Sequence, residues 1–324
     1  MKKKIFIIHT GGTIAMTEDQ KTGAVAPRDY HPLLSETGRL SELAHVITEE
    51  PFHLPSPHIT PVEMLQLRNL ICDAIKTKKI DGVVITHGTD TLEETAYFLD
   101  LTIKTEIPIV VTGAMRSNNE IGSDGLYNLL ASTRVAASDE AKEKGVLVVL
   151  NDEIHTAINA TKTHTSNVST FQSPQYGPIG IVTKRGIIFH HLPTKRAFFN
   201  IQDVSKRVAL LKVHAGMDAS LLYAIKDLKY DGVVIEAMGQ GNMPPAVIPG
   251  LQALLDAKIP IVLVSRCFNG IAQDVYEYEG GGKNLKEMGI IFANGLNGQK
   301  ARIKLLIALA KTTDLQTLDA LFQQ

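Results

Sequence analysis

The sequence predicts an α/β protein with a larger N-terminal domain on a doubly wound, mostly parallel sheet and a smaller C-terminal α/β domain. Short β-branched runs alternate with helical patterns along the chain, which is typical of βαβ units. The runs are apolar throughout, as in parallel strands that are buried on both faces. The chain has 324 residues, about twice the size of a typical domain, which favours two domains.

The strands and helices follow in order from these patterns. We expect strands at residues 5–8, 82–86, 107–112 and 146–150 in the first half, and at residues 232–235 and 259–264 in the second. Helical patterns lie between them, at residues 61–78, 91–103, 123–138 and 249–257. This alternation predicts parallel strands joined by crossover helices.

An internal echo supports two domains. KIDGVVI at residues 79–85 leads to IPIVV at 107–111, and KYDGVVI at 229–235 leads to IPIVL at 259–263. Either a duplication or two parallel-sheet edges that are packed in the same way would explain the two similar sequences. Residues 189–200 have no periodicity, which favours an exposed linker. We therefore predict domains at residues 1–188 and 207–324, joined by a linker at 189–206.

The charge balance argues against two classes of partner. The 33 Lys and Arg residues nearly balance the 34 Asp and Glu residues, so no global field attracts nucleic acid or anionic lipid. No stretch approaches the roughly 18 apolar residues of a membrane helix. The apolar run at residues 5–8 is too short for a signal peptide. We therefore expect a cytoplasmic protein that binds neither nucleic acid nor membrane. We interpret Cys72 and Cys267 as buried structural thiols.

Polar segments that follow the predicted strands are the first candidates for chemistry, because ligands of open α/β sheets bind at the carboxyl ends of strands. Thr13 follows a Gly-Gly turn, Thr89 and Asp90 open a helix, and Lys162 lies in a polar stretch. Each has a structural alternative, namely a tight turn, a helix cap and a solvated side chain. Their combination favours catalysis, because a lysine that is at least partly neutral can take the proton of a threonine hydroxyl.

Two glycine-rich segments and the histidines do not indicate a cofactor. GGGK at residues 280–283 lacks the remaining positions of a P-loop, and GQGN at residues 239–242 lacks the third glycine of a dinucleotide site. The 11 histidines are dispersed and show no metal-ligand spacing. We predict no metal and no cofactor.

A series of short motifs occurs in order across both halves of the chain. They are TGGTIA at 10–15, HGTDTLEETA at 87–96, TGAMR at 112–116, SDG at 123–125, ATKT at 160–163, TFQS at 170–173 and QKAR at 299–302. By these motifs the chain resembles the bacterial-type L-asparaginases over nearly its whole length. The resemblance implies hydrolysis of L-asparagine to L-aspartate and ammonia through a threonine acyl-enzyme, without metal or cofactor.

The resemblance also implies roles for the catalytic residues. Thr13 matches the first catalytic threonine of the family. Thr89, Asp90 and Lys162 match its second group, in which the lysine supports proton transfer and the acid also binds the substrate ammonium. The resemblance favours acylation of Thr13, with Thr89 activating the attacking water and its amide contributing to the oxyanion site.

Substrate binding and assembly are implied in the same way. Ser56 falls where the family contacts the substrate carboxylate, and the Ala114 carbonyl falls where it holds the side-chain amide. Asn242 matches a residue that reaches the site from a neighbouring subunit. The family implies a larger N-terminal and a smaller C-terminal α/β domain, and a homodimer or homotetramer.

Two departures from the family pattern concern the partners of these residues. The loop after Thr13 usually carries a tyrosine, and residues 17–27 contain none. Tyr30, Lys21 and a water molecule are the candidates to assist Thr13. Pro57 stands where many relatives have a glutamine, and residues 276–279 align poorly with the position of an acid from the partner subunit.

Three alternatives stay open beside asparagine hydrolysis. Mixed glutaminase-asparaginase activity is one, since one methylene is worth only about 1–3 kcal/mol of discrimination. The catalytic subunit of an archaeal-type tRNA-dependent amidotransferase looks similar, but it has extra N-terminal sequence and needs a basic docking surface. An inactive sensor of small amino acids has no need of two hydroxyls and a lysine in proton-transfer positions.

Overall fold

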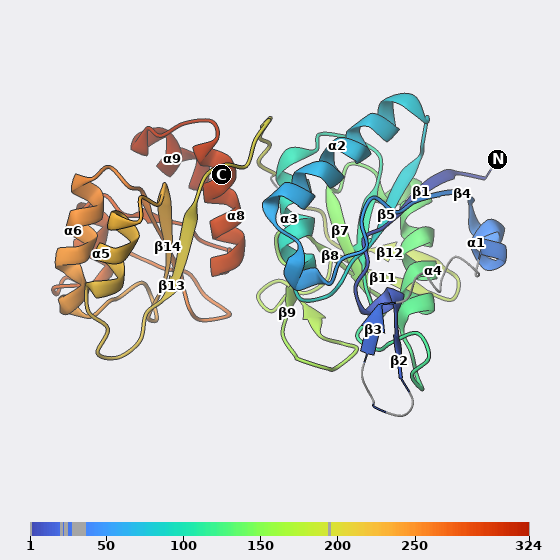
Figure 1. Cartoon of the computed structure of the whole chain (residues 1–324), viewed down its shortest axis with the longest axis horizontal. Coiled ribbons are helices and arrows are strands. Elements are labelled where there is room, and N and C mark those ends of the chain that lie inside the picture. Colours follow the sequence, from blue (N-terminus) through green and yellow to red (C-terminus); the bar gives the residue numbers. More distant parts are fainter. Residues whose placement is uncertain (1, 20–21, 23–24, 28–36, 194–195, 324) are drawn as a thin grey trace. The chain divides into compact units, whose positions relative to one another are not determined.

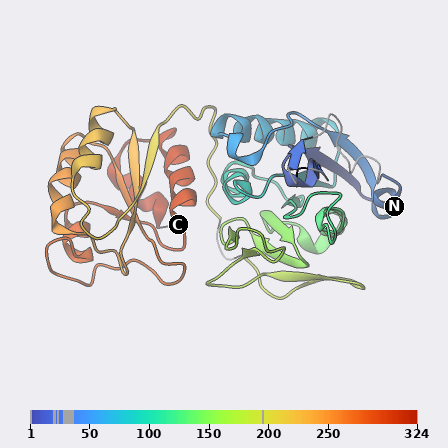
Figure 2. The ribbon, with the colours of Figure 1, turned by 60° about the horizontal axis from the view of Figure 1, so that its bottom comes forward.

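The computed structural model describes the chain except for residues 1, 20–21, 23–24, 28–36, 194–195 and 324. It contains two compact units, residues 1–198 and residues 199–324 (Figures 1 and 2). Within the described residues, no helix has both the length and the apolar character that crossing a membrane requires.

The first unit is organised around a sheet with eight strands among the described residues, in the order β12-β11-β8-β7-β6-β5-β1-β4. These are β1 (Lys4–His9), β4 (His45–Glu49), β5 (Gly82–Thr86), β6 (Ile109–Thr112), β7 (Val146–Leu150), β8 (Glu153–Thr156), β11 (Gly180–Thr183) and β12 (Gly186–Phe189). Strands β4, β1, β5, β6 and β7 pair in parallel. Strands β8, β11 and β12 extend the sheet in antiparallel pairing.

The change to antiparallel pairing begins at the turn between β7 and β8. Asn151 and Asp152 form this two-residue turn, and both have positive φ, 49° and 65°. Positive φ at both positions is the signature of a type I′ turn, which Asn and Asp tolerate better than most residues. The Asn-Asp pair therefore places β8 beside β7.

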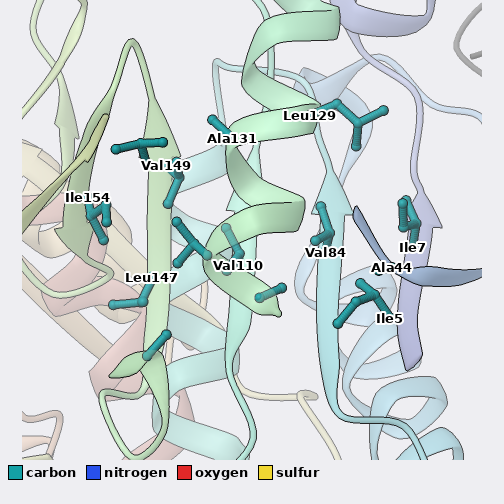
Figure 3. Close-up of a cluster of buried hydrophobic side chains, with 14 of the residues drawn as sticks. Ile5, Ile7, Ala44, Val84, Val110, Leu129, Ala131, Leu147, Val149 and Ile154 are labelled. Carbon is teal, nitrogen blue, oxygen red and sulfur yellow. The ribbon is translucent and has the colours of Figure 1, made fainter. Parts of the chain in front are cut away.

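Helices cover both faces of this sheet. They are α1 (Thr37–Leu43), α2 (Pro61–Thr77), α3 (Leu92–Thr102) and α4 (Gly125–Ala136). On one face, Leu129 and Ala131 of α4 pack over Ile7, Val84 and other buried side chains of the central strands (Figure 3). Side chains alternate along a strand, so Phe6 points to the opposite face, where Nζ of Lys78, the residue after α2, lies 4.3 Å from the centre of its ring. Helix α3 contacts α2, β6 and β7.

The second unit has a parallel sheet of four strands among the described residues, in the order β13-β14-β15-β16. The strands are β13 (Val208–Lys212), β14 (Gly232–Ala237), β15 (Ile261–Ser265) and β16 (Ile291–Phe292), and the helices are α5 (Ser220–Asp227), α6 (Ile248–Asp256), α7 (Gly282–Glu287), α8 (Gly298–Leu309) and α9 (Leu315–Phe322). Leu222 of α5 and Leu251 of α6 join the core on one face of this sheet. Helix α8 covers the other face, where Leu305 lies against Gly232. The predicted fold class is confirmed.

The sequence echo corresponds to one local structure that occurs in both units. Lys79 and Lys229 both have positive φ, 50° and 56°. Two residues later, an Asp side chain accepts a hydrogen bond from the start of the neighbouring strand, Asp81 from Lys4 N at 2.7 Å and Asp231 from Arg207 N at 2.8 Å. The repeated sequence thus performs the same task twice: it turns the chain and caps the adjacent parallel strand.

The segment predicted as an exposed linker is only partly exposed. Phe189 is the last residue of β12, and Phe199 and Ile201 are buried. The division between the two units falls after residue 198, inside the predicted linker range. The lack of periodicity in this segment did not show that some of its residues pack. The interpretation of the two thiols as buried is wrong for Cys267, which is exposed, whereas Cys72 is half-buried.

Candidate active site

Three neighbouring parallel strands end in the candidate segments. Strand β1 leads to Thr10 and the Gly-Gly turn, β5 leads to residues 87–91, and β6 leads to residues 113–116. Backbone hydrogen bonds continue between these segments beyond the strands, from Thr10 N to Thr86 O at 3.1 Å and from His87 N to Thr112 O at 2.8 Å. The loops are therefore extensions of a rigid sheet.

Two glycines bring the threonine-bearing loops into contact. Gly12 has φ of 84°, and a Cβ at this position would lie 2.2 Å from the Cα of Gly88. Only glycine allows both this backbone conformation and this close approach. Thr13 and Thr89 each follow one of these two glycines, so their backbones start from adjoining points at the edge of the sheet.

Lys162 reaches Thr89 and Asp90 from a separate hairpin. This hairpin pairs β9 (Thr161–Lys162) with β10 (Phe171–Gln172). The Lys162 Nζ lies 2.9 Å from Thr89 Oγ1 and 2.7 Å from Asp90 Oδ1. The Lys162 side chain is 17% exposed and that of Asp90 is 59% exposed. A hydroxyl, an amine and a carboxylate thus meet where solvent can enter from the Asp90 side.

Ser56 is fastened to the same helix start. It opens the short helix η3 (Ser56–His58) and is buried. Its Oγ accepts a hydrogen bond from Asp90 N at 3.2 Å, and its carbonyl accepts one from Thr91 Oγ1 at 2.7 Å. Because Ser56 Oγ is an acceptor in the first bond, its hydroxyl proton is left to donate elsewhere.

Ala114 lies in a tight turn after β6. A Cβ at Gly113, the preceding residue, would be 2.5 Å from the His87 carbonyl and 3.2 Å from Thr89 Cγ2, so this turn passes beside Thr89. The Asp124 carboxylate accepts hydrogen bonds from Met115 N at 3.1 Å and from Arg116 N at 3.0 Å. The SDG motif therefore holds the turn that presents Ala114.

His87, a buried histidine that the sequence does not single out, holds the loop that carries Thr89. His87 Nδ1 lies 2.8 Å from the Gly88 carbonyl, and its Nε2 lies 2.9 Å from Thr95 Oγ1. A carbonyl only accepts, so Nδ1 carries the proton and Nε2 accepts from the Thr95 hydroxyl. Burial lowers the pKa of His87 from 6.5 to about 4. A neutral imidazole therefore holds the loop at neutral pH.

The segment after Thr13 is a hairpin whose first strand is bound by the side chain of Asn119. Strands β2 (Met16–Glu18) and β3 (Val25–Pro27) pair in antiparallel fashion. The Asn119 side chain binds the backbone of Glu18 twice: Oδ1 accepts from Glu18 N, and Nδ2 donates to Glu18 O, both at 2.8 Å. Tyr30 and Lys21, the candidates to assist Thr13, lie outside the described residues.

The second unit carries the remaining predicted binding residue. Asn242 is half-buried, and its Oδ1 accepts a hydrogen bond from Gly282 N at 3.3 Å. It lies on a different unit from Thr13, Ser56, Thr89 and Lys162, so the geometry of the first unit does not include it. Among the described residues, no group of three or more His, Cys, Asp and Glu side chains is arranged to hold a metal ion.

The fold and the site together define a class: a two-unit α/β protein in which threonine, lysine and aspartate side chains meet at the carboxyl edge of the larger parallel sheet. Residues 4–195 match the family described as "Asparaginase, N-terminal", and residues 207–322 match the "Glutaminase/Asparaginase C-terminal domain". The chain belongs to the asparaginase family, and the resemblance of the motifs is confirmed.

Individual relatives cover nearly the whole chain. It is 39% identical to a "Probable L-asparaginase" of Deinococcus radiodurans, over 99% of this chain and 97% of that protein. It is 33% identical to a "Glutaminase-asparaginase" of Pseudomonas fluorescens, over 98% of this chain and 89% of that protein. Among solved structures, a "Probable Cytoplasmic L-asparaginase" of Campylobacter jejuni is 33% identical and covers 100% of both chains, with a TM-score of 0.90.

Proposed function

We propose that this protein hydrolyses L-asparagine to L-aspartate and ammonia through an ester formed on a threonine. The observation that carries the proposal is the placement of Lys162 Nζ within hydrogen-bonding distance of both Thr89 Oγ1 and Asp90 Oδ1. A threonine hydroxyl is a weak nucleophile and a weak base unless a neighbouring group moves its proton. Membership of the asparaginase family supports the substrate class.

The substrate is a small zwitterion, and the site offers complementary groups. The Asp90 carboxylate, which is largely exposed, suits the α-ammonium group. The Ser56 hydroxyl suits the α-carboxylate, because its oxygen already accepts from Asp90 N and its proton is left to donate. The Ala114 carbonyl suits the N–H of the side-chain amide. These contacts would orient the amide carbon towards the threonines.

The reaction has two halves. The Thr13 hydroxyl adds to the amide carbon, its proton passes to the departing nitrogen, the C–N bond breaks, and ammonia leaves an aspartyl ester on Thr13. Water then adds to the ester carbon, Thr89 with Lys162 takes its proton, the ester bond to Thr13 breaks, and that proton returns to Thr13 Oγ1, which regenerates the free hydroxyl. The Thr89 amide N–H, at the start of α3, stabilises the oxyanion in both halves. The opposite assignment of the two threonines is the alternative that mutagenesis separates.

The assembly belongs to the proposal. We expect a homodimer or homotetramer in which Asn242 of one subunit contributes to the site of its neighbour. We place the protein in the cytoplasm, in line with the Campylobacter jejuni protein whose name says so. Light scattering gives the assembly directly, and Asn242→Ala lowers activity without changing the fold of the first unit if Asn242 completes the site.

A mixed glutaminase-asparaginase is the second candidate. A relative with that name is 33% identical over 98% of this chain, so the family includes both specificities at this level of identity. Pro57, next to Ser56, is the departure near the carboxylate position. The discrimination needed is small, about 1–3 kcal/mol for one methylene.

Ammonia release by the purified protein tests these proposals. L-asparagine and L-glutamine are compared at several concentrations, so that the ratio of their kcat/KM values decides between the two specificities. Thr13→Ala and Thr89→Ala are each expected to lower kcat by at least about 1,000-fold, because each removes a reacting group. Full turnover in both variants contradicts the threonine mechanism. Asparagine binding without any ammonia release identifies the protein as a sensor instead.

A further inference from the structure

Residues at the start of helix α3 bind both the side-chain nitrogen and the backbone of Lys162. Thr89 and Asp90, which precede the helix, bind the Nζ of its side chain. Glu93, in the first turn of the helix, binds its backbone: Glu93 Oε1 accepts from Lys162 N at 3.3 Å. The same oxygen accepts from Thr161 Oγ1 at 3.1 Å.

Glu93 is the buried member of this group. Glu93 as a whole residue is 4% exposed, whereas the side chain of Asp90 is 59% exposed. A carboxylate is costly to bury unless it accepts hydrogen bonds, so the donors from Thr161 and Lys162 are part of what keeps it there. The buried carboxylate and strand β9 therefore hold each other in place.

The hairpin that carries Lys162 is short, although hydrogen bonds between Thr163 and Thr170 extend its pairing. Strands β9 and β10 each contain two residues. A short two-stranded hairpin is marginally stable by itself, so its position depends on contacts to the rest of the unit. The lysine side chain adds several rotatable bonds between its backbone and Nζ. A displacement of β9 by about 1 Å is enough to cost a factor of roughly 100 in rate when proton transfer depends on alignment.

We infer that Glu93 is a positioning residue for Lys162, and that it acts by clamping the backbone of β9 to the helix whose start binds the Lys162 Nζ. The inference rests on the proposed function, because it assigns Glu93 a role in the same proton transfer. The effect of Glu93 on the reaction passes through the placement of Lys162.

The expected effects separate positioning from charge and from general stability. Glu93→Ala removes the acceptor, and kcat is expected to fall about 10–100-fold with KM changed less than about threefold, because the proposed substrate contacts at Ser56, Asp90 and Ala114 are not on β9. Glu93→Gln keeps an acceptor oxygen and is expected to restore kcat to within about threefold of the wild type. Thr161→Val removes the hydroxyl that donates to Glu93 at nearly constant volume and is expected to lower kcat about 3–10-fold.

Asp100 provides a matched control in the same helix. It is also a buried carboxylate, and its Oδ1 also accepts from a strand amide, Val146 N at 2.9 Å, and pairs with Arg196 at 2.8 Å. It lies at the opposite end of α3 from the site. Asp100→Asn is expected to lower the unfolding midpoint while kcat and KM stay within about twofold of the wild type.

Steady-state ammonia release and thermal unfolding of all variants test the inference. It is overturned if Glu93→Ala and Thr161→Val both keep the wild-type kcat, or if Glu93→Ala loses no more kcat than Asp100→Asn. It is also overturned if Glu93→Gln is as slow as Glu93→Ala, since charge rather than the clamp would then matter. If Glu93→Ala does not fold, the kcat values of Thr161→Val and Glu93→Gln still test the inference. Failure of the proposed function looks different: Lys162→Met then matches the wild type, and the inference falls with it.

Discussion

Replacing Lys304 by Met is expected to stabilise the second unit. Lys304 lies on α8, the residue is 3% exposed, and its Nζ stands 5.0 Å from the centre of the Phe322 ring. Burial lowers the pKa of Lys304 from 10.5 to about 8. At neutral pH the folded protein therefore keeps a charge where the apolar surroundings disfavour it.

The size of the effect follows from the pKa difference. A lowering from 10.5 to about 8 corresponds to about 3 kcal/mol of unfolding free energy lost at neutral pH. The cation–π contact with Phe322 offsets about 0.5–2 kcal/mol of this, so we expect a net gain of about 1–3 kcal/mol for Lys304→Met at pH 7. Met suits the site because it is unbranched, flexible and apolar.

The pH dependence gives the prediction its sign. Between pH 8 and 10.5 the unfolded chain binds more protons at Lys304 than the folded chain does, so the contribution of Lys304 to stability rises with pH. The advantage of Lys304→Met is therefore full below pH 8 and disappears by about pH 10.5. Urea unfolding at pH 7, 9 and 10.5 measures the difference between the two proteins. Lys311→Met, at an exposed position just after α8, is the control and should change nothing.

Two results would refute the reasoning about Lys304. One is an unfolding free energy of Lys304→Met at or below that of the wild type at pH 7. The other is a difference between the two proteins that stays constant from pH 7 to pH 10.5, which would mean that the ammonium is not destabilised by burial.

Three further predictions concern the first unit. Gly12→Ala places a Cβ 2.2 Å from Gly88 Cα at a φ of 84°, so we expect kcat to fall more than tenfold and unfolding free energy to fall by about 1–3 kcal/mol in urea titrations. The pKa of His87 is about 4, below 6.5, so the unfolded chain binds more protons between these values and stability falls as the pH drops through this window. His87→Gln should flatten that acid slope by up to one proton, and an unchanged slope argues against the neutral imidazole. Asn119→Ala removes both hydrogen bonds to Glu18, worth about 1 kcal/mol each, and kcat/KM should fall about 5–30-fold, while a wild-type kcat/KM would show that the clamp on β2 is dispensable.

The local patterns of the sequence were sufficient for the central parallel strands and for the segments of the candidate site. The predicted strands at residues 82–86 and 146–150 coincide with β5 and β7, since an unbroken apolar run has few alternatives to a strand buried on both faces. The antiparallel strands β8, β11 and β12 were missed. They are short, and the first of them, β8, is placed by the two-residue turn at Asn151 and Asp152, a weaker signal than an apolar run.

The candidate site was predictable as a set of segments and not as a set of contacts. Thr13, Thr89 and Asp90 follow strands directly, and their place at the sheet edge follows from topology. Lys162 follows no long strand, and it reaches Thr89 across 73 residues of chain through a hairpin. No periodicity indicated that His87 and Glu93 hold the site segments, because a polar residue is expected to be exposed unless its hydrogen-bond partners are known.

The sequence by itself determined the fold class and the loops of the candidate site, because hydrophobic runs and glycine requirements are local properties of the chain. Tertiary structure alone decided which polar groups meet: Ser56 with Asp90, Lys162 with Thr89, Glu93 with the backbone of β9. The residues of these pairs are 34, 73 and 69 positions apart in the chain, respectively. Their energies, and the buried charge of Lys304, arise only when the folded chain excludes water from them.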